Sequence, residues 1–253
     1  NYNNLKRFFL LNSKKRTITS KSLSSPILRV SNLVQDGNIF ADFTMLATQH
    51  KAMNLGQGFP SFGSPTFLSK YVNEVSIGDS YCEDGPANLN NQYSKPGEEL
   101  LLSQVLVNKY SKKFGYNLTS SNICTTVGAQ EGIFTTLATY CNPGDEIVII
   151  TPSFDAYFKT ASLLGLKVNA VPLKCLKTTN VIANDYKLDY NELRNTLTNN
   201  TRLLILNTPS APLGKVFSKE ELQEISNVVQ EFNNLLVVSD EVYEYMTYDN
   251  LIL

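Results

Sequence analysis

The chain from Asn122 onward alternates short apolar runs with amphipathic segments. The apolar runs are of strand length and rich in aliphatic residues: NICTTVG, EIVIIT, KVNAVPL, RLLILN and LLVVSD. The segments between them carry apolar residues at helical spacing: AQEGIFTTLATYC, FDAYFKTASLLG, DYNELRNTLT and SKEELQEISNVVQEF. Asp189 stands at the N-cap of the third helix, and Ser218 with Glu221 forms a capping box for the fourth. Apolar strands joined by such helices predict a mostly parallel sheet covered on both faces, which is a three-layer αβα fold.

The chain before Asn122 has a less regular pattern. Two polar loops rich in Gly, Pro and Asn flank a short predicted helix, TFLSKYVNEVSI; they are NLGQGFPSFGSP and CEDGPANLNNQYSKPGEE. A longer helix follows over ELLLSQVLVNKYSKKF, and Gly115 stands where helices commonly end in the left-handed conformation. The regular strand–helix rhythm is therefore confined to the second half of the chain.

The composition is that of an ordinary globular protein, with 42% hydrophobic and 18% charged residues. Lys and Arg total 22 against 23 Asp and Glu, a balance that argues against a nucleic-acid-binding surface. No apolar run is long enough to cross a bilayer. No C-x-x-C pair occurs among the cysteines, which we expect to be reduced and buried: Cys82, Cys124, Cys141 and Cys175. The single histidine, His50, is expected on a loop or at the surface, so neither a zinc centre nor a histidine-based triad is predicted.

Residues 1–35 form a separate Ser-rich segment in which every charged residue is basic. This composition resembles a mitochondrial transit peptide, with a basic tail of a cytosolic protein as the alternative. The protein is therefore expected in the mitochondrion or the cytoplasm. Because the chain does not begin with Met, its natural start is expected further upstream.

Four loops follow the predicted strands, and ligands of open parallel sheets bind beyond the carboxyl ends of the strands. In VGAQEG, Gly128, Ala129 and Gln130 open a helix whose free N–H groups suit a phosphate, although close strand–helix packing would explain the same small residues. In TPSFDAY, Phe154 and Tyr157 are aromatic rings that either stack on a planar ligand or fill the core. The third loop, NTPSAPLGK, leaves the sheet sharply and suits the wall of a cleft.

Asp240 carries the most information of these loop residues. It ends the apolar run LLVVSD, so burial of its carboxylate is unfavourable unless a cation or a strong hydrogen-bond donor pairs with it. A protonated ring nitrogen would meet it, and Tyr243 would then reach a neighbouring ring oxygen. The alternative on these residues alone is that Asp240 caps a following helix. A phosphate turn, a stacking ring, a carboxylate and a phenol along one sheet edge together indicate a site for pyridoxal phosphate.

Several motifs resemble the class I aminotransferases of fold type I. They are NLGQGFP, NQYS, GAQEGI, GDEIVIITPSFDAY, NTPSAPLGKVFSKEEL and SDEVYEYM, which run in family order from about Asn54 to Asn250. The resemblance is strongest to the branch of kynurenine aminotransferases and cysteine-conjugate β-lyases. It implies part of the pyridoxal-phosphate-binding large domain over residues 91–253, incomplete at the C-terminus, and an N-terminal arm with a portion of the small domain over residues 36–90.

The resemblance also implies a role for each matching residue. Ala129 and Gln130 would hold the cofactor phosphate through their backbone N–H groups, and Phe154 would stack on the pyridine ring. Asp240 would pair with the pyridinium nitrogen, and Tyr243 would hydrogen-bond the ring hydroxyl.

Two further residues have implied roles outside the sheet edge. Gly58, in GQGFP, would line the site for the substrate carboxylate. Tyr93, in NQYS, would reach across a homodimer interface to the partner's phosphate, although the compact run around it implies some displacement. The chain departs from the family at Ala211, because APLG stands where N-P-x-G is usual. The asparagine of that motif touches the ring hydroxyl and the substrate carboxylate, so its loss would weaken binding by roughly one to a few kcal/mol.

No catalytic residue is assigned within the chain. In the family, the Schiff-base lysine lies beyond the SDEVY segment and the substrate-binding arginine lies further still, so neither is expected before Leu253. Lys215 and Lys219 follow a strand but are placed on the helix that opens at Ser218. Because transamination needs the lysine to carry the cofactor and to move the Cα proton, the 253-residue chain alone is expected to be inactive. Its sheet is expected to keep an unpaired edge.

The function implied by the resemblance is transfer of an amino group from kynurenine, or a related aromatic or sulfur-bearing amino acid, to a 2-oxo acid. The sequence does not separate this reaction from β-elimination of cysteine conjugates. A noncatalytic, degenerate paralogue is the third alternative. Ala211 favours it, whereas the retained Asp240 and Tyr243 argue against it.

Overall fold

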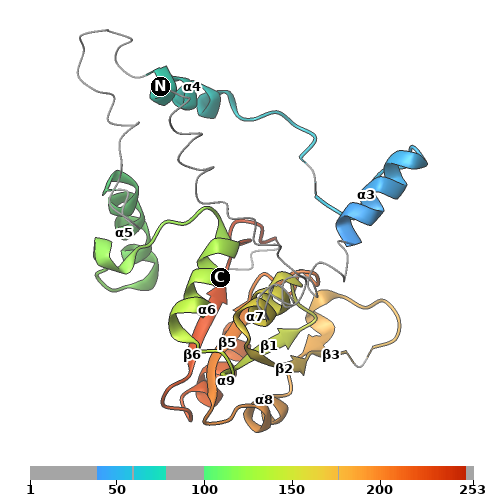
Figure 1. Ribbon diagram of the computed structural model, residues 1–253, viewed down its shortest axis with the longest axis vertical. Coiled ribbons are helices and arrows are strands. Elements are labelled where there is room, and N and C mark those ends of the chain that lie inside the picture. Colours follow the sequence, from blue (N-terminus) through green and yellow to red (C-terminus); the bar gives the residue numbers. More distant parts are fainter. Residues whose placement is uncertain (1–38, 59, 78–99, 176, 249–253) are drawn as a thin grey trace, which may run out of the picture. The chain divides into compact units, whose positions relative to one another are not determined.

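The computed structural model describes residues 39–58, 60–77, 100–175 and 177–248 (Figure 1). These residues fall into two compact units, of which the first runs from Thr136 onward and the second covers Ile39–Thr135. The basic segment 1–35 and the two predicted domain boundaries, after residues 35 and 90, lie outside the described residues.

The described residues of the second unit form helices and loops. Its helices are α3 (Ile39–Gln49), α4 (Thr66–Ile77), α5 (Leu100–Phe114), the 3-10 turn η2 (Ser120–Asn122) and the first part of α6 (Ala129–Tyr140). The predicted helices over α4 and α5 are confirmed, and Gly115 after α5 has a φ of 73°, the left-handed conformation expected of it. No prediction covered α3, which buries none of its residues. His50 lies in the exposed turn after α3, as predicted.

The first unit is built on a four-stranded parallel sheet in the order β2-β1-β5-β6 (Figure 1). The strands match four of the predicted runs to within a residue at either end: β1 (Glu146–Thr151), β2 (Lys167–Pro172), β5 (Thr201–Asn207) and β6 (Leu236–Asp240). From β1 the chain moves outward to β2 and then returns to the other side of β1 for β5 and β6. The strand order therefore reverses between β1 and β5, and the carboxyl ends of strands at such a switch point are where α/β proteins bind ligands.

The helices of this unit match predicted helical segments, and the last two begin at the caps that the sequence predicts. These helices are α7 (Ala156–Leu164), α8 (Tyr190–Thr196) and α9 (Lys219–Val229). The Asp189 carboxylate accepts two N–H groups of the first turn of α8, each at 3.1 Å. At the start of α9 the Ser218 hydroxyl accepts the N–H of Glu221 at 3.2 Å, and the Glu221 carboxylate accepts the N–H of Ser218 at 3.0 Å. A small antiparallel ribbon of β3 (Lys174–Cys175) and β4 (Tyr186–Lys187) lies between β2 and α8 in the chain.

Both faces of the sheet are buried along its two central strands, β1 and β5. On one face, alternate strand residues pack against α8 and α9 in a single apolar cluster that includes Val148, Ile150, Leu204, Leu206, Leu193 and Ile225. The intervening strand residues are buried on the opposite face, where α7 lies: Ile147, Ile149, Leu203 and Ile205 (Figure 1). The predicted three-layer αβα arrangement is thus confirmed, and it explains why these strands show no polar alternation.

One predicted strand is wrong. Residues 122–128, NICTTVG, begin in the turn η2 and continue without strand geometry. An apolar segment becomes a strand only when a neighbouring strand completes its hydrogen bonds. No described strand pairs with this segment, so its β-branched composition does not produce a strand.

The free edge expected of the sheet is present at β6. Within the described residues β6 pairs with β5 and with no second strand. Leu236 and Val237 are both 43% exposed there, although both lie in an apolar strand. The edge therefore presents backbone groups and aliphatic side chains that another strand would cover.

Three cysteines are described, and all are free thiols. The prediction of burial holds for Cys141, is wrong for the exposed Cys124, and is met only in part by Cys175, which is half-buried. Cys82 lies outside the described residues. No cluster of metal-ligating side chains occurs among the described residues, and none of their helices is long and apolar enough to span a membrane.

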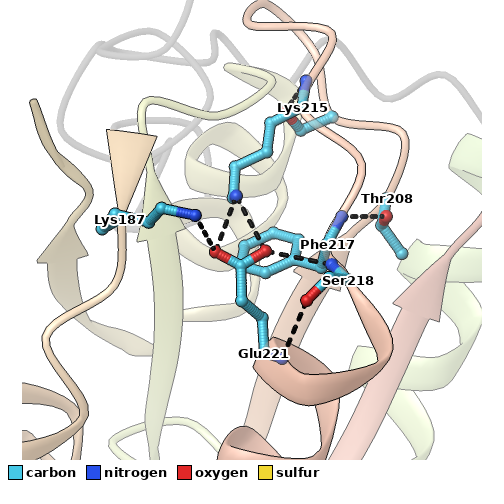
Figure 2. Close-up of polar contacts among 7 residues, drawn as sticks. Lys187, Thr208, Lys215, Phe217, Ser218 and Glu221 are labelled. Carbon is cyan, nitrogen blue, oxygen red and sulfur yellow. Dashed lines mark hydrogen bonds and ion pairs between the residues drawn. The ribbon is translucent and has the colours of Figure 1, made fainter. Parts of the chain in front are cut away.

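The loop between β5 and α9 is fixed by a buried ion pair (Figure 2). Lys215 is fully buried, and its ammonium group donates to both carboxylate oxygens of Glu221 at 3.0 Å each and lies 4.8 Å from the centre of the Phe217 ring. Lys187 of β4 donates to the same carboxylate at 3.1 Å. The placement of Lys215 on the α9 helix is wrong, because it precedes the N-cap Ser218 and turns back into the interior.

This ion pair makes the stability of the fold dependent on pH. Burial by itself would raise the pKa of Glu221, but the N–H of Ser218 and the ammonium groups of Lys215 and Lys187 outweigh it and lower that pKa below its ordinary value of 4.5. A depressed pKa contributes stability that is complete above the pKa of the unfolded chain and is lost as pH falls through the folded value. Glu221→Gln should therefore cost about 3 kcal/mol of unfolding free energy at neutral pH, and the cost should shrink below about pH 4.5.

Urea unfolding of the wild type and the variant from pH 7 to about pH 3 measures both effects. Glu231→Gln is the matched control, since its pair with Arg194 is exposed to solvent and should contribute little to the free energy of unfolding. An equal loss in both variants, or a difference for Glu221→Gln that does not change with pH, would contradict this account.

Candidate functional site

Asp240 ends β6 with its side chain nearly buried, at 9% exposure. The hydroxyl of Tyr157, in the first turn of α7, donates to the Oδ2 atom of Asp240 at 2.6 Å. The N–H of Val242 donates to Oδ1 at 3.2 Å. Tyr157 is only 1% exposed, and this burial, together with the bond to the Asp240 carboxylate, raises its pKa far above the ordinary value. Tyr157 therefore stays protonated and acts as a neutral donor.

The arrangement distinguishes between the two predicted roles of Asp240. Residues 242–245 form a turn rather than a helix, so the alternative of a helix N-cap is wrong; the bond to Val242 closes a local turn. No lysine or arginine of the described residues forms an ion pair with Asp240. Because an ionised carboxylate can accept about four hydrogen bonds, this side chain still has room for a cationic donor.

Phe154 and Tyr243 also lie beyond the carboxyl ends of the strands, as Asp240 does. Phe154 follows β1 and meets the Tyr157 ring edge-on, with ring centres 5.8 Å apart and an interplanar angle of 87°. Its ring is 38% exposed, so part of its surface remains open. Tyr243 is also 38% exposed, and it lies close enough to Tyr157 to contribute to the raised pKa of that phenol. The structure therefore brings Phe154, Asp240 and Tyr243 together around Tyr157.

The loop that carries Ala211 is tied to the same strand end. The side-chain amide of Asn207, the last residue of β5, donates to the main-chain oxygens of Asp240 at 2.9 Å and Pro209 at 3.2 Å. Its oxygen accepts the N–H of Ala211 at 2.7 Å. The N–H of Thr208 also donates to the main-chain oxygen of Asp240, at 3.1 Å. Sequence analysis missed Asn207; its position at the end of an apolar strand, equivalent to that of Asp240, was the available signal.

The predicted phosphate residues open a helix but belong to the other compact unit. Ala129 and Gln130 are the first two residues of α6, and the first N–H groups of an α-helix have no acceptor within it. Gly128 before them has a φ of 94°, and a side chain there would meet no atom within 4 Å. The geometry suits an anion, and the role of these residues stays a prediction.

Gly58 and Tyr93 are not joined to the sheet edge by the described residues. Gly58 is exposed in the loop after α3. Nearby Asn54 fixes this loop by donating to the Thr44 hydroxyl at 3.1 Å and accepting the N–H of Gly56 at 2.8 Å. Tyr93 lies outside the described residues. The implied roles of both residues stay predictions.

Comparison with known proteins identifies the family. The chain matches the family described as aminotransferase class I and II over residues 50–252. It is 36% identical over 222 residues to a kynurenine–oxoglutarate transaminase of Dictyostelium discoideum, which covers 84% of this chain and 49% of that protein. Kynurenine–oxoglutarate transaminase 1 of Rattus norvegicus is 34% identical over 218 residues, covering 85% of this chain and 49% of the relative.

Solved structures agree with the sequence match. N-succinyldiaminopimelate aminotransferase from Mycobacterium tuberculosis has a TM-score of 0.74 at 30% identity, over 88% of this chain and 54% of that one. Bna3p from Saccharomyces cerevisiae has a TM-score of 0.75 at 30% identity, over 85% and 50% of the two chains. The chain spans about half the length of the curated relatives that it matches. The chain belongs to the class I and II aminotransferase family.

Proposed function

We propose that this chain forms the cofactor-binding part of a pyridoxal-phosphate-dependent aminotransferase. The observation that carries the proposal is the nearly buried carboxylate of Asp240, which ends the apolar strand β6 beside the switch-point strand β5 and has neutral donors but no cation among its described partners. A buried carboxylate without a cationic partner is costly, and a protonated ring nitrogen would offset that cost.

The side chains at this edge suit such a ring. The part-exposed face of Phe154 would pack on it, Asp240 would accept the N–H of its protonated nitrogen, and Tyr243 would donate to its hydroxyl. Ala129 and Gln130 would hold the phosphate at the N-terminus of α6. Gly58 would lie near the substrate carboxylate, and Tyr93 would act across a homodimer interface. Bound there, the cofactor supplies a ring that withdraws electrons from the substrate Cα.

The amino donor we propose is kynurenine or a related aromatic or sulfur-bearing amino acid, with a 2-oxo acid as acceptor. Support comes from the relatives named kynurenine–oxoglutarate transaminase, which are 31–36% identical to this chain. Proton transfer at the substrate is assigned to none of the described residues. Lys215 is fully buried and paired with Glu221, and Lys219 is an exposed residue of α9.

The proposed reaction is tested with a protein that contains this chain and has the full length of the relatives. With kynurenine and 2-oxoglutarate, we expect amino transfer, measured as glutamate formed together with loss of kynurenine. A cysteine conjugate supplied to the same protein should yield less pyruvate and ammonia than amino-transfer product. Pyruvate and ammonia as the main products would favour a β-lyase instead, and no turnover of either substrate would favour a noncatalytic protein.

Removing the charge of Asp240 should weaken cofactor binding. Asp240→Asn keeps the shape of the side chain but loses the ion pair with the ring nitrogen, so the Kd for pyridoxal phosphate should rise about 10- to 30-fold. Titration followed by cofactor absorbance or fluorescence measures it. Asp145→Asn is the control, because Asp145 precedes β1 and so lies at the amino ends of the strands, away from Asp240. The Kd of this variant for pyridoxal phosphate should stay at the wild-type value. Equal affinities of wild type and Asp240→Asn would refute the assignment.

Restoring the family's asparagine at Ala211 should strengthen binding. The Ala211 loop is held in place by Asn207, so an amide at position 211 would project from a fixed backbone. We expect Ala211→Asn to lower the Kd for pyridoxal phosphate about fivefold, since one hydrogen bond contributes about 1 kcal/mol. Ala211→Leu has a similar shape without the polar group and should give no gain. A gain in both variants, or in neither, would show that position 211 does not hydrogen-bond the cofactor.

A further inference from the structure

We propose that Tyr157 is a positioning residue for the cofactor, which acts by orienting the Asp240 carboxylate toward the ring nitrogen. The inference rests on the proposed function, because it assigns Tyr157 a role only where Asp240 meets a pyridinium. It adds a residue that sequence analysis treated as a stacking ring or core filler.

The contact is specific and shielded from water. The Tyr157 hydroxyl reaches Asp240 Oδ2 at 2.6 Å across a separation of 83 residues, from the first turn of α7 to the end of β6. Tyr157 is 1% exposed and Asp240 is 9% exposed, so solvent has little access to compete for the bond. Hydrogen bonds to an ionised group at this distance are among the stronger ones in proteins.

Both oxygens of the carboxylate and its backbone are held. Tyr157 binds Oδ2, and the N–H of Val242 binds Oδ1 at 3.2 Å. Asn207 and Thr208 donate to the main-chain oxygen of Asp240, at 2.9 and 3.1 Å. The carboxylate plane therefore has little freedom to rotate, and its remaining lone pairs point in fixed directions.

The donor to Asp240 is a neutral phenol, so it leaves the negative charge of the carboxylate available to a cationic ligand. A lysine or arginine in place of Tyr157 would neutralise Asp240 and compete with a pyridinium for it. A phenol orients the carboxylate while leaving its full negative charge available to a cation. The Tyr157 ring also meets Phe154 edge-on at 5.8 Å, so one buried side chain supports both the ring-stacking residue and the ring-nitrogen partner.

The test compares two ligands. Pyridoxal phosphate is titrated beside its analogue in which a C–H group replaces the ring nitrogen, in the wild type and in Tyr157→Phe, which keeps the buried ring. If Tyr157 acts through Asp240 and the ring nitrogen, the Kd of Tyr157→Phe for pyridoxal phosphate should be about tenfold higher than that of the wild type. The Kd for the analogue should change less than about twofold, because the analogue makes no bond that Tyr157 could orient. In an Asp240→Asn background, Tyr157→Phe should have no further effect on pyridoxal phosphate.

The other outcomes overturn the proposal in distinguishable ways. Equal weakening of both ligands by Tyr157→Phe would make Tyr157 a packing residue, and no weakening of either would make the hydroxyl irrelevant. An effect that persists in the Asp240→Asn background would show that Tyr157 does not act through Asp240. Wild-type protein that binds neither ligand, or binds both equally, would instead refute the proposed function and the inference with it. Tyr186→Phe, which removes a phenol hydroxyl beside the core away from this edge, is the matched control, with urea unfolding as a check on folding.

Discussion

The arrangement of the first unit depends on a carboxylate placed at the end of an apolar strand. Burial of Asp240 is unfavourable on its own, and the surrounding residues reduce that cost with neutral donors rather than with a cation. Each donor comes from a different place: Tyr157 from the helix after β1, and Val242 from the turn after β6. The strand ends of β5 and β6 are further joined by Asn207, which also sets the path of the Ala211 loop. The site is thus a small network of hydrogen bonds across three parallel strands.

Two nearly buried carboxylates in this unit are stabilised in different ways, one by cations and the other by neutral donors. Glu221 has two ammonium groups and a backbone N–H, and its partners complete its charge and its hydrogen bonds (Figure 2). That arrangement is structural, since it locks the β5–α9 loop to the helix it precedes. Asp240 has no cation among the described residues, so its charge stays uncompensated. The contrast is the physical reason to place ligand chemistry at Asp240 and to treat Lys215 as part of the scaffold, although a lysine near a strand end invites a catalytic assignment.

Topology explains why these groups meet. The chain crosses from β1 to β2 and back to β5, so the loops after β1 and β5 diverge at the switch point, and the end of β6 lies beside that of β5. Phe154, Ala211 and Asp240 come from those three strand ends. The same sheet ends in an edge at β6 whose aliphatic side chains are partly exposed within the described residues. The chain spans about half the length of the curated relatives that it matches.

The sequence by itself determined the elements whose signals are local. The four paired strands follow from apolar runs of strand length, and helices α8 and α9 begin where Asp189 and Ser218 supply side-chain caps. The family motifs identified Asp240, Phe154 and Tyr243, and the structure gathers them at one sheet edge. Tertiary structure alone decided the contacts between residues distant in the chain. Residues 122–128 have strand composition but no strand neighbour, and Lys215 looks like a helix residue but is drawn inward by Glu221. Tyr157 finds Asp240 83 residues away. Hydrophobic periodicity and helix caps depend on residues that are close in the sequence. Strand pairing and buried hydrogen bonds depend instead on which distant segment of the chain lies alongside.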